Sequence, residues 1–353
     1  MLAITTALTV CALLLPALRP VSHRPRAPSP LASLYSTTTI PYDGQTYTVK
    51  VQSASAGNED CPPVLCIPPV GVGISREFYE PLHREWAALG APCELHTPDL
   101  LGCGDAQPKP RRFYTPEYWA NQLMSYVNGT VKRPVIVLSQ GGLLPVALEM
   151  WRAGGTDSIA GVSFVSPPPR RFFAPTAEAE AGVRGRFSEG AGKPPPGRSR
   201  QRAFWLVSQS SLGGFFFRYL RGGVGQPRIR AFSQRNLFAD ADRVDDEWMD
   251  MCYAGSQDTR SRHATLAYLC GTLPGGSWRD DRSDLLRSLS VPVQVLRGSA
   301  AINASQRLDA FVECVPCPSC CGLVEDGRSV MPYENAPEVA KRLALFIADL
   351  GKK

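Results

Sequence analysis

The sequence predicts an α/β protein with a mostly parallel sheet, helices on both faces of the sheet and an inserted helical cap. Short apolar, β-branched runs alternate with segments whose apolar residues recur at helical spacing. One such run, residues 135–138, ends in a serine and two glycines and passes at once into a helical pattern. Strands that alternate with helices pair in parallel and are covered on both faces.

Each element follows from its local pattern. Alternating or continuous apolar runs bounded by turn residues predict the strands, and apolar residues at three- and four-residue spacing predict the helices. The strands are expected at residues 47–51, 63–67, 94–97, 135–138, 159–165 and 291–296. The helices are expected after residue 75, from 116 to 127, up to 151 after the glycine pair, and from 337 to 350.

The chain of 353 residues divides into four parts at shifts in composition. Residues 1–42 hold an apolar stretch followed by an Arg-, Pro- and Ser-rich stretch, and contain no acid. This resembles a bipartite plastid-targeting leader, with secretion as the alternative. The apolar stretch is too short and interrupted for a stable membrane span. We expect a core at 43–169, an insert at 170–285 and the rest of the core at 286–353.

The insert has two sections. Residues 172–200 are rich in Gly, Pro, Arg and Ala and are expected to form a disordered loop. Residues 203–284 carry many aromatic residues at helical spacing and are expected to form a cap over the carboxyl ends of the strands. Residues 170–202 carry an excess of basic charges, but no aromatic residue interleaves the run from Ala174 to Gly185, so we predict a solvated segment and no nucleic-acid partner. The sequence does not indicate an oligomeric state.

Four of the eleven cysteines, Cys314, Cys317, Cys320 and Cys321, lie within eight residues. Zinc and iron–sulfur sites use such spacings, but closed metal sites usually draw their ligands from two separated segments. A cysteine-rich surface loop or a local disulfide is therefore favoured, and no metal or cofactor is predicted.

The junction at residues 135–142 has the layout of a nucleophile elbow, a sharp strand-to-helix turn that presents a serine hydroxyl above a sheet. Ser139 is followed by Gln140, Gly141 and Gly142, as in G-x-S-x-G, although Val137 occupies the first glycine position. Ser139 is therefore the candidate nucleophile.

The chain resembles the α/β-hydrolase superfamily at this elbow and at two loops, residues 68–73 and 98–105. The resemblance spans about residues 45–169 and 286–350, with the insert at the cap position. Residues 68–79 are further similar to uncharacterised plant-plastid and cyanobacterial members.

The resemblance implies a nucleophile at Ser139 and an oxyanion hole formed by the amides of Gln140 and of Val70 or Gly71. The other two members of the triad do not carry over. No acid follows the strand ending at 296, and residues 327–334, where the family has its histidine, contain none. His263 in the cap is the one candidate base.

Two functional hypotheses follow. The first is a serine hydrolase that acts on an ester or lipid-like substrate through Ser139 with an incomplete triad. The second is a catalytically silent protein of the same fold that binds an apolar small molecule or a protein partner. The surroundings of the Ser139 hydroxyl distinguish the two, because a serine is a weak nucleophile without an adjacent base.

Overall fold

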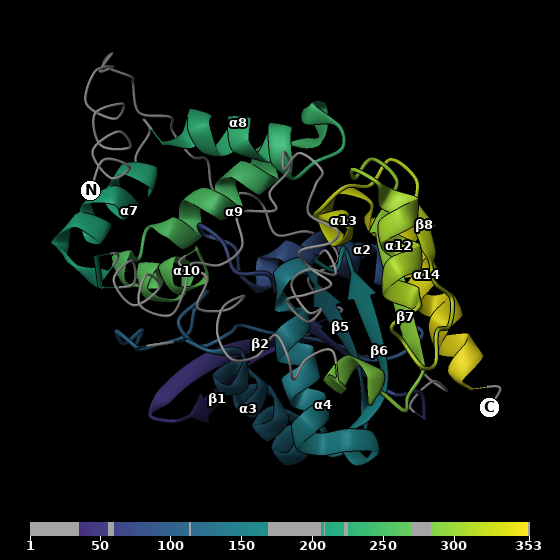
Figure 1. Cartoon of the computed structure of the whole chain (residues 1–353). Coiled ribbons are helices and arrows are strands. Elements are labelled where there is room, and N and C mark those ends of the chain that lie inside the picture. The colour runs from purple at the N-terminus through teal and green to yellow at the C-terminus, as the bar shows by residue number, and fades with distance from the viewer. Residues whose placement is uncertain are drawn as a thin grey trace.

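The computed structural model describes residues 35–55, 60–112, 114–168, 206–207, 209–221, 225–269 and 284–351. The expectations for residues 1–34 and 172–200 lie outside these residues, and the plastid leader stays a prediction. A central sheet is covered by helices on both faces, and a group of helices lies across one end of it (Figure 1).

The sheet has eight strands in the order β1-β2-β4-β3-β5-β6-β7-β8 among the described residues. The strands are β1 (Tyr35–Tyr42), β2 (Gln45–Gln52), β3 (Val64–Ile67), β4 (Leu95–Pro98), β5 (Val135–Gln140), β6 (Ile159–Val165), β7 (Val293–Gly298) and β8 (Gly322–Val324). β2 pairs antiparallel with both β1 and β4, and every other pairing is parallel. The α/β class, the parallel sheet and the helical insert are confirmed.

The expected start of the folded core at residue 43 is wrong, because β1 pairs along its whole length with β2, from Tyr35 opposite Gln52 to Tyr42 opposite Gln45. The two strands are joined by Asp43 and Gly44, which both have positive φ, 49° and 69°. An Asp-Gly pair in this conformation forms a tight hairpin turn. The lack of acidic residues before Asp43 favours a leader that ends at residue 42. The Tyr and Thr residues at 35–42, however, are typical of a strand.

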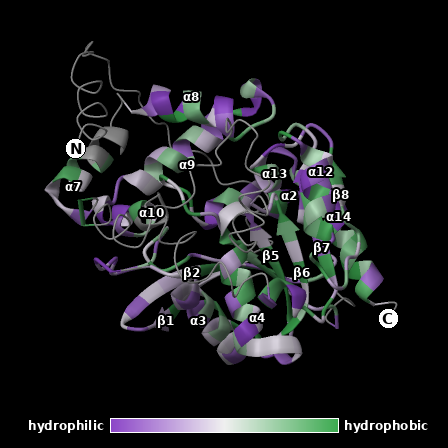
Figure 2. Ribbon diagram, in the orientation of Figure 1, coloured by the Kyte–Doolittle hydropathy of each residue, from purple (hydrophilic) through white to green (hydrophobic). Residues whose placement is uncertain are grey.

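Two layers of helices enclose the sheet. The helices are α2 (Glu80–Ala88), α3 (Pro116–Tyr126), α4 (Leu144–Ser158), α12 (Ala304–Val312), α13 (Met331–Glu334) and α14 (Ala336–Leu350). Apolar residues of α3, α4 and α12 form one core with alternate residues of the strands, and those of α2, α13 and α14 form the other. β3 to β7 are almost wholly buried, and β5 and β6 consist mostly of hydrophobic residues (Figure 2). No helix of the described residues has both the length and the apolar character needed to cross a bilayer.

The insert between β6 and β7 forms the cap. It contains α7 (Ser211–Arg221), α8 (Gln226–Asn236), α9 (Asp246–Ser256) and α10 (Arg262–Leu269), and its described residues include no strand. These helices group together over one end of the sheet (Figure 1). The ring of Trp248 in α9 packs against Phe78, Phe238 and Tyr333, with centroids 5.0–6.4 Å apart. Part of the cap's aromatic set therefore anchors it to the sheet domain.

Candidate active site

The candidate site lies at the carboxyl edge of the parallel strands, where ligands bind in open α/β sheets. The loop after β3 meets the cap there, since the Thr265 hydroxyl of α10 donates to the carbonyl of Gly71 at 3.0 Å. The backbone of Gly73 lies directly against that of Cys252 in α9. The cap thus covers the loop that resembles the family's oxyanion loop.

The sharp turn after β5 is formed by Gly141. Its φ is +56°, whereas Ser139 and Gln140 are strand residues that pair with Phe164 and Val165 of β6. A 3-10 turn, η4 (Gly141–Leu143), leads directly into α4. A positive φ is unfavourable for residues with a Cβ and normal for glycine. The elbow therefore carries a glycine, and the prediction that Ser139 stands on it is wrong.

Ser139 lies two residues before the turn, inside β5. Its side chain is 1% exposed and its hydroxyl has no hydrogen-bond partner in the described part of the chain. A hydroxyl in this state has no base among the described residues to accept its proton, and its burial keeps it from a substrate.

Of the amides expected in the oxyanion hole, that of Gln140 belongs to the strand and not to the helix N-terminus. Gln140 ends the strand, and its side-chain amide donates to the carbonyl of Ser329. The first helical donor after the turn is Leu144, whose amide bonds the carbonyl of Gly141. The amides that open this helix therefore come after Gln140. Val70 is buried and Gly71 is half-buried in the loop after β3, beneath α10.

His263 is the second residue of α10 and is 6% exposed. Its Nδ1 contacts the side-chain oxygen of Gln209 within the cap. Burial, followed by the charges of nearby arginines, lowers its pKa to about 4. The structure does not bring this imidazole into hydrogen-bond contact with Ser139.

The segment at the family's histidine position, which includes Arg328 and Ser329, forms hydrogen bonds to the ends of β5 and β6 and to the cap. The carbonyl of Arg328 accepts from the Ser166 hydroxyl at 3.1 Å, and Ser329 accepts from Gln140. The Arg328 guanidinium donates at 2.6 Å to the carbonyl of Arg235 in the cap. These residues lie beside the ends of β5 and β6 and supply no imidazole, as the sequence predicted.

A buried ion pair links two of the edge loops, which the sequence did not identify. Asp99 is fully buried, pairs with Arg76 and accepts the amide of Asp105 at 2.9 Å. Burial raises the pKa of Asp99 to about 6, against the opposing effect of Arg76. A Cβ at Gly104, whose φ is +49°, would lie 2.0 Å from the Asp99 carboxylate. The glycine spacing of the 98–105 loop thus makes room for this carboxylate.

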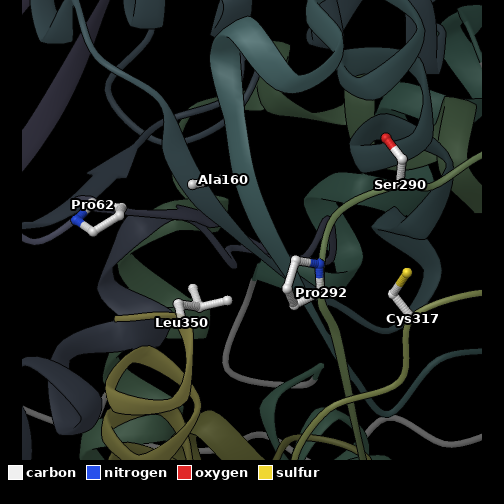
Figure 3. A pocket seen from close by; sticks show the side chains of 6 residues that line it. All are labelled: Pro62, Ala160, Ser290, Pro292, Cys317 and Leu350. Atoms are coloured by element: carbon white, nitrogen blue, oxygen red, sulfur yellow. The ribbon is translucent and has the colours of Figure 1, made fainter. Parts of the chain in front are cut away.

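A pocket of about 430 Å³ lies at the opposite, amino edge of the sheet (Figure 3). It is lined by Pro62, Ala160, Ser290, Pro292, Cys317 and Leu350. The four clustered cysteines, one of which lines this pocket, are free thiols. In the described ranges, no three His, Cys, Asp or Glu side chains are placed to hold a metal ion.

Residues 64–342 match the profile described as Alpha/beta hydrolase family. A thermophilic esterase from Thermogutta terrifontis is 18% identical, with a TM-score of 0.60 over 90% of this chain and 98% of that chain. The Cif epoxide hydrolase from Acinetobacter nosocomialis is 16% identical, with a TM-score of 0.63 over 89% and 90%. A haloalkane dehalogenase from Bradyrhizobium elkani is 17% identical, with a TM-score of 0.58 over 90% and 99%. At these identities the likeness shows the fold. None of the curated proteins matches significantly.

Proposed function

We propose that this chain, which belongs to the Alpha/beta hydrolase family, is a catalytically silent member that binds a small apolar molecule beneath its cap. The observation that carries the proposal is the glycine at the elbow, Gly141. Nucleophilic catalysis needs an attacking atom on the side chain that the elbow presents, and glycine has none. The fold alone does not supply activity.

Space at the elbow supports a binding role. Among the described residues, a Cβ built on Gly141 would have one heavy atom within 4 Å, the carbonyl oxygen of Ser166 at 4.0 Å. The carboxyl edge is where this class of sheet binds ligands, and the cap helices lie over it (Figure 1).

The rival hypothesis, slow hydrolysis through Ser139, has less support. It needs the buried strand hydroxyl to become exposed and to gain a base, yet His263 is engaged with Gln209. The activities named for the similar structures are those of other proteins, whose sequences differ at more than four positions in five.

Turnover of p-nitrophenyl acetate, butyrate and octanoate by the natural chain and by Ser139→Ala tests the proposal. Both proteins are expected to show the same background rate. Ser163→Ala is the matched control, because Ser163 is also a buried strand serine. Turnover of about 1–10³ s⁻¹ that Ser139→Ala alone abolishes would contradict the proposal.

A further inference from the structure

We infer that the carboxyl edge of the sheet binds the anionic head group of its ligand, a carboxylate or a phosphate, with Arg297 as the cationic partner. The inference rests on the proposed function, because it supplies the polar end of the apolar ligand. It follows from a buried arginine and an uncapped helix terminus that both lie beside the backbone of Ser166 and Pro167.

Arg297 lies in β7 and is 5% exposed. Its Nη2 donates to the carbonyl of Pro167 at 2.7 Å, but its buried Nε has no hydrogen-bond partner. No carboxylate of the described residues forms a salt bridge with it, and the charge that acts on it comes from a second cation, Arg307. Burial and then Arg307 lower its pKa to about 10, so it stays charged at neutral pH.

A buried cation without an anionic partner is destabilising, because removing its charge from water carries a large desolvation penalty. A hydrophobic side chain of similar length would fill the same place without this penalty. An arginine in such a position is explained when an anion pairs with it, and its planar guanidinium suits carboxylate and phosphate oxygens.

Arg297 and Gly141 both lie beside the residues that follow β6, at the carboxyl edge of the sheet. Arg297 donates to the carbonyl of Pro167, and the carbonyl oxygen of the preceding residue, Ser166, lies 4.0 Å from a Cβ built on Gly141. The strand register places Ser139 beside Phe164, and Phe164 beside Val295. Since alternate residues share a face, the side chains of Ser139 and Arg297 project from the same face of the sheet.

The second contribution comes from α4, which is 15 residues long and follows this turn directly. The N-cap of α4 is Leu143, which makes no side-chain hydrogen bond to cap the helix. The amides of a helix N-terminus and the helix dipole both favour a bound anion. Arg297 and this terminus thus place positive potential on the same space.

Thermal unfolding tests the inference on the natural chain, Arg297→Met and the control Arg287→Met. The control removes a half-exposed arginine that pairs with Asp284. Without a probe, Arg297→Met is expected to melt at the same temperature as the natural chain or higher. Decanoate or dodecyl phosphate should raise the melting temperature of the natural chain and of Arg287→Met, and leave Arg297→Met unchanged. If only decanoate raises the melting temperature, the natural head group is a carboxylate. If only dodecyl phosphate raises it, the head group is a phosphate.

Three results would overturn the inference: no shift with either probe, an equal shift with neutral decanol, or an equal shift in Arg297→Met. If Arg297→Met does not fold, Arg297→Lys, which keeps the charge, replaces it, and calorimetry measures the binding of decanoate. Binding to Arg297→Lys that is at least tenfold weaker than to the natural chain would support the inference. Absence of saturable binding to the natural chain would overturn it. Ester turnover through Ser139 would remove the proposed function and leave these anion measurements unaffected, so the two failures are distinguishable.

Discussion

Replacing Gly255 by alanine is expected to weaken the docking of the cap on the sheet domain. A Cβ at this position of α9 would lie 2.2 Å from the carbonyl oxygen of Gly73 and 2.7 Å from its carbonyl carbon. Ordinary contacts begin near 3.4 Å, so the helix and the loop must separate by more than an ångström. Overpacking of this kind costs about 1–3 kcal/mol, and the better helix propensity of alanine returns up to about 1 kcal/mol. We expect a net loss of about 1–2 kcal/mol in unfolding free energy.

Gly214→Ala is the matched control, because it lies in the cap helix α7 with Arg262 as its nearest neighbour at 3.8 Å. This variant should be as stable as the natural chain or more stable by up to about 1 kcal/mol. Urea unfolding of the three proteins measures the difference. Equal stability of Gly255→Ala and Gly214→Ala would refute the close approach of α9 to the loop after β3.

Two further predictions concern the elbow and the cap histidine. Gly141→Ser should fold and lose about 1–2 kcal/mol of stability at the positive φ. It should gain no ester turnover in a spectrophotometric assay, because no described imidazole lies within 4 Å of a Cβ at this position. Turnover above background would show that a base is present. Burial lowers the pKa of His263 to about 4 from 6.5, so the unfolded chain binds more protons below pH 6.5 and the stability from this group is lost as the pH falls towards 4. The unfolding free energy of the natural chain relative to His263→Gln should therefore decrease between pH 7 and pH 5, and a difference that does not change with pH would contradict the assignment.

Much of the fold is predictable because the apolar residues of each strand or helix recur at the spacing typical of that element. β6 has the expected bounds, Ile159–Val165, since a continuous apolar run closes at a serine and prolines. β1 is not predicted, because the segment before Asp43 contains no acid and continues the composition of the leader. The Asp43-Gly44 pair is nevertheless typical of the hairpin that joins β1 and β2.

The site was less predictable, because a shift of two residues at the end of β5 changes which residue forms the turn. The apolar run suggests an end at 138, whereas the strand continues through Ser139 and Gln140. A positive φ favours glycine, and Gly141 was the local signal for the true turn. The sequence did show that no acid follows β7, but the burial of Arg297 depends on residues distant in the chain, such as Pro167.

The central claim is that the elbow presents no nucleophile, and labelling with a fluorophosphonate tests it without a choice of substrate. The natural chain and Ser139→Ala are incubated with an excess of the probe, and the intact mass of each is measured. We predict that neither protein forms an adduct, because Ser139 is buried in a strand without a base and Gly141 has no side chain. A stoichiometric adduct on Ser139 of the natural chain, absent from Ser139→Ala, would contradict the account.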